Sequence, residues 1–230
     1  INICNERILY YKMLQYFAFS QWLSLKKYAF DNGISIIGDM PIYVAGDSAD
    51  VWANREIFKL DSNLEASDLA GCPPDYFSPD GQLWGNPVYD WRKLKKEKYA
   101  WWIERLNHSF KIYDIVRIDH FRGFESYYSI KAGSKTARKG AWRKGGGKSF
   151  FDALPKEFND RIIAENLGFL TDEVDKLLEY TGFPGMKVLQ FSFDSRDENS
   201  KTLPDDIKKN NVVYTGTHDN LSLIHISEPT

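Results

Sequence analysis

Cysteine is scarce in this sequence of 230 residues, and so are the patterns of secretion, membrane insertion and nucleic-acid binding. Cys4 and Cys72 are far apart and form no CxxC pair, which argues against a disulfide framework or a cysteine zinc site. Apolar runs are only a few residues long, whereas a membrane helix needs roughly 20, and no signal pattern opens the chain. Lys and Arg number 30 against 32 Asp and Glu, so the basic excess of a nucleic-acid-binding protein is missing. We expect a cytoplasmic protein that binds neither membranes nor nucleic acid.

Aromatic residues, in contrast, are plentiful. Seven Trp and thirteen Tyr accompany a hydrophobic content of 43% and a net charge of −2. This composition is typical of one globular domain, or of part of a larger one. Because Tyr and Trp suit binding grooves that are half apolar and half wet, sugars are one ligand class that the composition favours.

Short apolar strands alternate with helical segments along the chain. Strands bounded by turn residues are predicted at 34–38, 112–118, 161–164, 186–189 and 212–215. Helical periodicity predicts helices at 6–30, 93–110, 150–159 and 171–180. This alternation predicts a parallel sheet. No GxGxxG follows a strand, and the segments after the strands are long and rich in Asp, Asn, Tyr and Trp, so we predict an α/β fold of the (β/α)8 TIM-barrel type. It is incomplete, with only about strands 3 to 7 of the barrel present.

Three of the predicted strands end on an acid, namely Asp119, Glu165 and Asp219. In a barrel these strand ends converge, and burial together with mutual repulsion should keep one carboxyl protonated near neutral pH. A protonated carboxyl beside an ionised one is what cleavage of a glycosidic bond needs. Two alternatives remain open: the acids could be helix caps or solvated loop residues, or they could bind a catalytic metal with His120 and His218, although no HxH or HExxH spacing supports a metal site.

The segment Val116-Arg117-Ile118-Asp119-His120-Phe121-Arg122-Gly123-Phe124 resembles the amylomaltase family of 4-α-glucanotransferases, also called disproportionating enzymes. Six other segments match the family in the same order: 38–45, 73–78, 82–87, 163–168, 184–191 and 213–220. Seven motifs in order, spanning nearly residues 10 to 220, make the resemblance specific.

The resemblance implies that Asp119 is the nucleophile, Glu165 the general acid/base, and Asp219 the carboxylate that stabilises the transition state. Such an enzyme is retaining, because a covalent glycosyl intermediate forms and is then passed on. The implied reaction transfers α-1,4-glucan segments between maltooligosaccharides, with no metal or organic cofactor. An α-glucan hydrolase of the same clan is the alternative, and a truncated, catalytically incompetent fragment is another.

Substrate contacts are implied at several further positions. Arg117 lies two residues before Asp119, on the same side of the strand, where its guanidinium can keep that carboxylate ionised. The remaining residues each have a structural alternative, such as packing or loop support. They are His218, Asp75, Gln82, Trp84, Tyr43 and Phe191.

We assign residues 1–220 to the partial catalytic barrel and 221–230 to a tail unrelated to the family. Within the barrel we predict a lid or subsite loop at about 61–90. A basic loop is predicted at about 131–148, a stretch with seven Lys or Arg and no acid. Asn166 stands where an acid commonly follows the catalytic Glu in the family, and we expect this change to tune Glu165 without abolishing its role.

Overall fold

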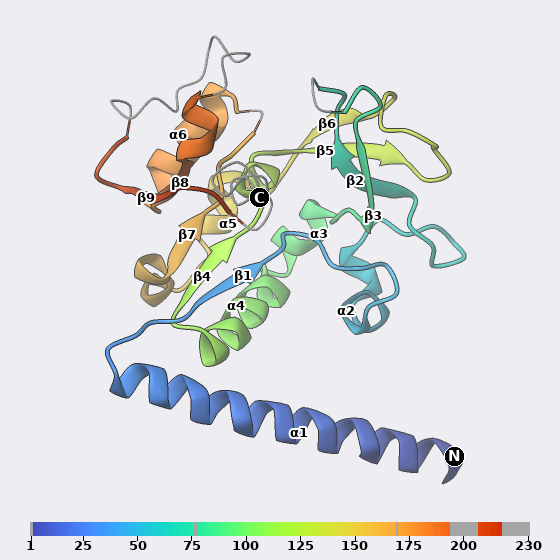
Figure 1. The fold of residues 1–230 in the computed structure, drawn as a ribbon. Coiled ribbons are helices and arrows are strands. Elements are labelled where there is room, and N and C mark those ends of the chain that lie inside the picture. Colours follow the sequence, from blue (N-terminus) through green and yellow to red (C-terminus); the bar gives the residue numbers. More distant parts are fainter. Residues whose placement is uncertain (1, 76–77, 169, 194–206, 218–230) are drawn as a thin grey trace, which may run out of the picture.

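The chain is built around a parallel β-sheet of five strands. The computed structural model describes residues 2–75, 78–168, 170–193 and 207–217, and within them the strands follow the order β1-β4-β7-β8-β9. The strands are β1 (Ile37–Met40), β4 (Ile115–Ile118), β7 (Ile162–Ala164), β8 (Gly185–Val188) and β9 (Asn211–Tyr214) (Figure 1). All neighbouring pairs are parallel. Because the order in the sheet follows the order in the chain, each crossover leads to the adjacent strand, as in a (β/α)8 barrel.

All five strands predicted from the sequence are present, with shifted bounds. β1 begins at Ile37 instead of residue 34, and β4 begins at Ile115 instead of residue 112. The carboxylate of Asp114 accepts the N–H of Ile36 at 2.8 Å, so the regular ladder begins one residue later. Side chains of the central strands, such as Val116 and Ile118, are fully buried in the main core.

Helices cover the sheet, and two of them replace a single predicted helix. α3 (Trp91–Lys96) and α4 (Ala100–Ile112) occupy the range predicted as one helix at 93–110. Lys98 and Tyr99 both adopt positive φ, at 53° and 58°, and this left-handed conformation ends α3 and lets α4 start in a new direction. α4 contacts both β1 and β4.

The helix predicted at 150–159 is also divided. α5 (Gly147–Phe151) is followed by the 3-10 helix η3 (Lys156–Arg161), with Pro155 at the start of η3. Proline has no N–H and a fixed φ, so it begins a new helix more readily than it continues an old one.

The prediction at 171–180 is confirmed by α6 (Asp172–Thr181). The remaining short helices are α2 (Ala49–Ala53), η1 (Arg55–Ile57), η2 (Phe121–Phe124) and η4 (Leu189–Phe193).

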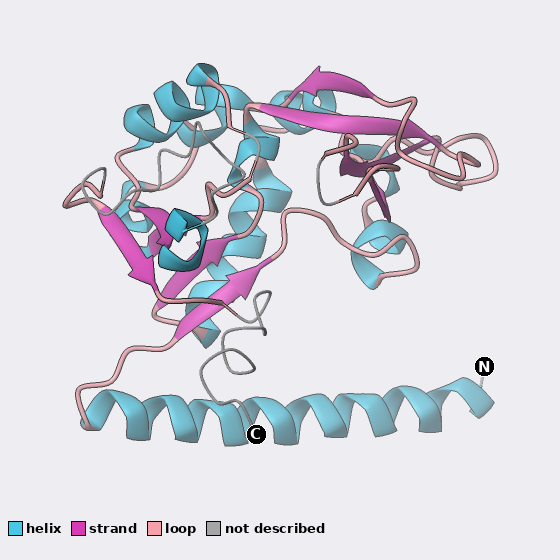
Figure 2. Cartoon of the chain, turned by 45° about the horizontal axis from the view of Figure 1, so that its top comes forward, coloured by secondary structure: helices cyan, strands magenta, loops and turns pink. Residues whose placement is uncertain are grey.

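A second, antiparallel sheet lies to one side of the parallel sheet (Figure 2). Its order is β3-β2-β5-β6, with β2 (Asp68–Cys72), β3 (Gln82–Pro87), β5 (Ser126–Lys131) and β6 (Ala141–Lys144). The segments 61–90 and 131–148, which we predicted as loops, therefore contain strands. These strands are hard to predict from the sequence. β2 and β3 contain Gly, Asp, Asn and Pro, which are uncommon in strands, and β6 contains exposed basic residues.

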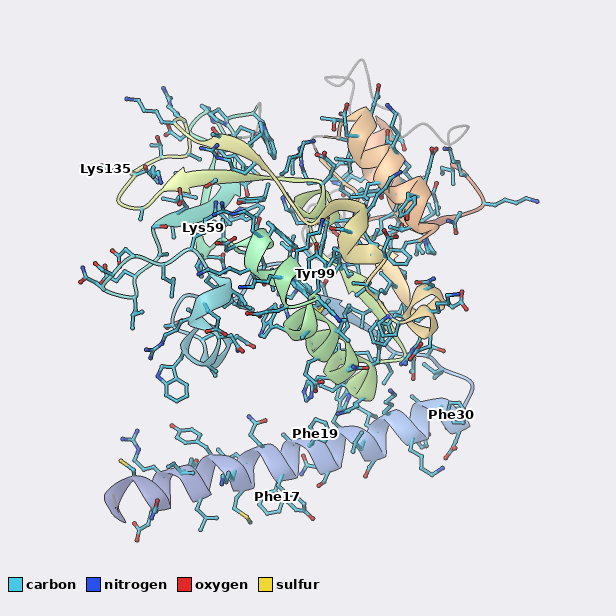
Figure 3. All side chains as sticks on the ribbon, turned by 180° about the vertical axis from the view of Figure 1, so that it is seen from behind. Phe17, Phe19, Phe30, Lys59, Tyr99 and Lys135 are labelled. Carbon is cyan, nitrogen blue, oxygen red and sulfur yellow. The ribbon has the colours of Figure 1, made fainter. Side chains whose placement is uncertain are left out.

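The long helix α1 (Asn2–Asp31) confirms the helix predicted at 6–30, but most of its apolar side chains are exposed. It touches α4 through a few contacts, among them Phe19 against His108 at 6.0 Å, and Trp22 packs against Tyr113, just after α4, at 5.9 Å. Figure 3 shows Phe19 on the side that faces the body of the protein and Phe17 on the opposite side. No helix in the described part of the chain is long and apolar enough to cross a membrane.

Candidate active site

Asp119 and Glu165 follow two neighbouring strands of the parallel sheet. In the register of β4 and β7, Ile118 pairs with Ala164, so each acid is the next residue after a paired position. The main chain continues this pairing, because Glu165 donates its N–H to the carbonyl of Ile118 at 2.9 Å. The two acids therefore lie side by side at the carboxyl edge of the sheet, which is the catalytic edge of a (β/α)8 barrel.

Both carboxyl oxygens of Glu165 are held by main-chain N–H groups. His120 donates to Oε2 and Leu167 donates to Oε1, each at 2.7 Å. Burial raises the pKa of Glu165 to about 7 and the charge of Asp119 adds to the rise, while the two N–H groups and Arg117 act in the opposite direction. We predicted a raised pKa at one of the strand-end carboxyl groups. The pKa of Glu165 is raised, and burial is the main cause.

Arg117 contacts Asp119, as the spacing predicted, but its main partner is a different acid. Its guanidinium binds Asp39 through two hydrogen bonds, of 2.9 Å from Nε and 2.5 Å from Nη2, and reaches Asp119 at 3.4 Å. Burial opposes the charge of Arg117, yet the hydrogen bond and charge of Asp39 and the charges of the other carboxylates raise its pKa. The cation is therefore shared between Asp39 on β1 and Asp119 after β4.

A cavity of about 170 Å³ opens beside Asp119. Trp84 of β3 and His120 form one wall, with their rings 4.9 Å apart and nearly perpendicular. Tyr43 also borders the cavity, but it is buried and stacks on Tyr89 with ring centroids 5.8 Å apart. Burial raises the pKa of Tyr43 well above its ordinary value. The full lining is Pro41, Ile42, Tyr43, Trp84, Asn86, Asp119 and His120.

The other predicted substrate contacts lie in varied positions. Gln82 is exposed on β3 and accepts the indole N–H of Trp84 at 3.0 Å. Asp75 is exposed, and its carboxylate closes a tight turn by accepting the N–H of Ser78 at 2.7 Å. Phe191 is half-buried in η4 and does not border the cavity beside the nucleophile candidate. His218 and Asp219 lie outside the described residues.

A second hollow of about 360 Å³ is bordered by residues of the parallel strands. It is bordered by Asp39 and Arg117, together with Met186 of β8 and Tyr214 of β9. Arg117 borders this hollow, and Asp119 borders the cavity described above. Because the two side chains are in contact, this ion pair lies between the two hollows. Within the described residues, no group of three or more His, Cys, Asp or Glu side chains could hold a metal ion.

The structure gives three residues near the site contacts that the sequence did not predict. Asp39 lies in the matching segment 38–45 and was given no role, and its pairing with Arg117 joins residues 78 positions apart. His120 was considered only as a metal ligand, whereas its main chain holds Glu165. Asn166 is buried, and its side-chain oxygen accepts the N–H of Met186 at 2.7 Å, which ties the end of β7 to the start of β8.

The parallel sheet and its carboxyl-edge acids define a class, the (β/α)8 barrels, of which the described residues supply five neighbouring strands. Comparison with known proteins identifies the family within this class. Residues 2–226 match the glycoside hydrolase 77 family, described as 4-alpha-glucanotransferase. The chain belongs to this family.

Individual relatives agree with this assignment. The 4-alpha-glucanotransferase of Streptococcus pneumoniae TIGR4 is 59% identical over 220 residues, which cover 95% of this chain and 43% of that protein. The 4-alpha-glucanotransferase of Thermus thermophilus is 48% identical over 218 residues, covering 94% of this chain and 43% of that protein. A solved structure, amylomaltase from Streptococcus agalactiae in complex with acarbose, aligns with a TM-score of 0.88 at 47% identity, covering 92% of this chain and 43% of that one. The chain thus spans less than half the length of these relatives.

Proposed function

We propose that the protein containing this chain is a 4-α-glucanotransferase that transfers α-1,4-glucan segments between maltooligosaccharides with retention of configuration. The observation that carries the proposal is the pair formed by Glu165, whose pKa burial raises to about 7, and Asp119, which lies beside a buried guanidinium. One carboxyl is thus suited to exchanging a proton at neutral pH, and the other to remaining ionised.

In the proposed reaction, the carboxylate of Asp119 attacks the anomeric carbon of the donor while Glu165 protonates the departing glycosidic oxygen. A covalent glycosyl ester forms on Asp119, and the C–O bond to the leaving glucan breaks. Glu165 then accepts the proton of an incoming sugar hydroxyl, which attacks the ester and releases Asp119. Asp219 is assigned the third role, stabilisation of the transition state.

Trp84 provides the best platform for a sugar ring beside Asp119. Its ring borders the same cavity as the nucleophile and is held by Gln82 and His120. Sugar faces pack well on indole rings, whose polar N–H is here already satisfied. We propose Trp84 and Gln82 as substrate contacts, with His218, Arg117, Tyr43, Asp75 and Phe191 as further candidates.

The test uses the full-length protein and maltotriose. A transferase releases glucose and builds longer oligomers, whereas a hydrolase of the same clan gives only shorter products even when acceptor is abundant. The Asp119→Asn variant should lower turnover by a factor of about 10⁴ while oligosaccharide binding persists, because the nucleophile is lost and little ground-state affinity with it. Exclusive hydrolysis at high acceptor concentration would refute the transferase assignment.

We also propose that the protein acts in the cytoplasm. Cys4 is exposed and Cys72 half-buried, and both are free thiols, which suits a reducing compartment. Fractionation of cells that produce the full-length protein would test this location.

A further inference from the structure

We infer that His120 is a positioning residue for the proposed reaction: its left-handed main chain holds the carboxyl group of Glu165, and its imidazole supports Trp84. The inference rests on the proposed function for its kinetic consequences. Its structural basis is the turn that joins β4 to η2, at which the chain leaves the sheet immediately after Asp119.

Two consecutive N–H groups of this turn are directed at one residue. His120 donates to the carboxyl Oε2 of Glu165 at 2.7 Å, and Phe121 donates to the main-chain carbonyl of Glu165 at 3.0 Å. In an extended chain, successive N–H groups point to opposite sides. The positive φ of His120, 54°, turns both toward Glu165. Few residues other than Gly, Asn, Asp and His adopt this conformation readily, so the backbone itself restricts what can stand at position 120.

The imidazole of His120 has a separate role. It meets the ring of Trp84 edge-on at 4.9 Å, and burial, helped by the charge of Arg122, lowers its pKa to about 3. The ring is therefore neutral at physiological pH. A Cβ at Gly123 would lie 3.2 Å from the imidazole and 2.6 Å from Ile42, so Gly123 leaves little space on that side of the ring. His120 thus supports the sugar platform without adding a charge to the site.

The charges that face Glu165 fix the direction of the kinetic effect. Asp119 raises its pKa and Arg117 lowers it, both from the β4 side, while Cys72 of β2 faces it as a thiol whose own pKa burial raises to about 11. The N–H of His120 stabilises the ionised carboxylate. Losing this hydrogen bond should therefore raise the pKa of Glu165, and the fall in activity on the alkaline side should move to higher pH.

Two substitutions at position 120 separate the main chain from the ring. His120→Gly keeps the left-handed conformation and the N–H but removes the imidazole. His120→Val keeps a side chain, but a β-branched residue strongly disfavours positive φ and should displace the N–H. Lys98→Val is the matched control, because Lys98 is exposed, has φ 53° and lies outside the site.

In the full-length enzyme, His120→Val should lower kcat by about 100-fold and shift the alkaline limb of the pH–rate profile upward by about half a unit or more. His120→Gly should leave that limb in place and raise KM for maltotriose by about tenfold, because the support of Trp84 is lost. Lys98→Val should change neither. An unmoved alkaline limb in a folded His120→Val enzyme, or an equal shift in both variants at position 120, would overturn the inference.

An NMR measurement that does not depend on catalysis tests the inference if the valine variant fails to fold or the unmodified protein shows no transfer. The amide resonance of His120 in the NMR spectrum of the full-length protein should titrate with a midpoint near pH 7, and this titration should vanish in Glu165→Gln. The amide of Lys98 should not titrate. A His120 resonance that is insensitive to pH would overturn the inference, whereas absence of transfer in the unmodified protein would refute only the proposed function.

Discussion

At the scale of single residues, one cation serves two carboxylates. Arg117 binds Asp39 through two hydrogen bonds and contacts Asp119 more weakly. This arrangement makes Asp39 a competitor for the charge that stabilises the proposed nucleophile. It also fixes the guanidinium in a plane, because a bidentate pair is more strongly directional than a single hydrogen bond.

Asp39→Asn in the full-length enzyme tests this competition. In this variant Arg117 no longer pairs with a carboxylate at position 39, so its charge acts mainly on Asp119. The ionised form of Asp119 should be favoured, and the acid limb of the pH–rate profile should move to lower pH. Loss of the rigid pair should also lower kcat, by about 10- to 100-fold. Asp31→Asn, which removes an exposed acid paired with Lys27, is the control and should leave both measurements unchanged. An unshifted acid limb would show that Asp39 does not act on Asp119.

Glu165 should also make stability depend on pH. Its pKa is about 7 in the folded protein against an ordinary 4.5, so between these values the native state retains a proton that the unfolded chain has lost. The contribution is complete below about pH 4.5 and should be lost as pH rises to about 7, lowering the free energy of unfolding by about 1–3 kcal/mol. Denaturant titrations of the full-length protein and of Glu165→Gln should differ by this slope. Parallel pH dependences would contradict the assignment.

The acids themselves could be predicted from the sequence, but their partners could not. Asp119 and Glu165 each follow a short buried strand, and the carboxyl ends of parallel strands meet at one edge. Asp39 and His120 act through a pairing across 78 positions and through a left-handed turn. Neither feature leaves a periodic pattern in the chain, because both arise only when the strands have been assembled.

At the scale of elements, the packing of α4 against β1 depends on a glycine. A Cβ added at Gly38 would lie 2.0 Å from the ring of Tyr113, which follows α4. Gly38→Ala should therefore force the ring away and destabilise the full-length protein by about 1–3 kcal/mol. Gly46→Ala is the matched control, because the nearest atom to its Cβ would be Pro87 at 3.8 Å, and it should stay within about 0.5 kcal/mol of the unmodified protein. Equal midpoints of denaturation would show that Tyr113 adjusts freely.

The two sheets were not equally predictable. The inner parallel strands β4, β7 and β8 are mostly buried, and all five parallel strands are short apolar runs between turn residues, so their composition was enough to predict them. Two of the antiparallel strands carry the opposite signal: every residue of β6 is exposed, and β2 contains Asp68 and Gly71. Gly71 is required there because a Cβ would lie 2.0 Å from the carbonyl oxygen of Gln82. Strand pairing, and not local preference, creates that sheet.

At the scale of the whole molecule, α1 presents an unusually apolar surface. Exposed contiguous apolar patches in soluble proteins usually mark surfaces that bind other polypeptide. The contacts that hold α1 to the rest of the chain are few, and include the hydrogen bond from the indole of Trp22 to the carbonyl of Ile112 at 2.9 Å. Its exposed apolar side chains include Ile8, Leu9, Tyr10, Tyr11, Met13, Leu14, Tyr16, Phe17, Leu23, Leu25, Tyr28 and Phe30.

We therefore expect this 230-residue chain, when expressed by itself, to bind a hydrophobic dye, to self-associate and to melt without a single sharp transition. Three substitutions on α1, Leu9→Lys, Tyr16→Glu and Leu25→Lys, replace exposed side chains only and should reduce dye binding and self-association. The matched control, Lys12→Glu, alters charge on the same helix without removing apolar surface and should have little effect. Dye fluorescence, sedimentation and circular dichroism provide the measurements. A monomeric chain with a cooperative melt and no dye binding would show that the apolar surface of α1 is compatible with an independent fold.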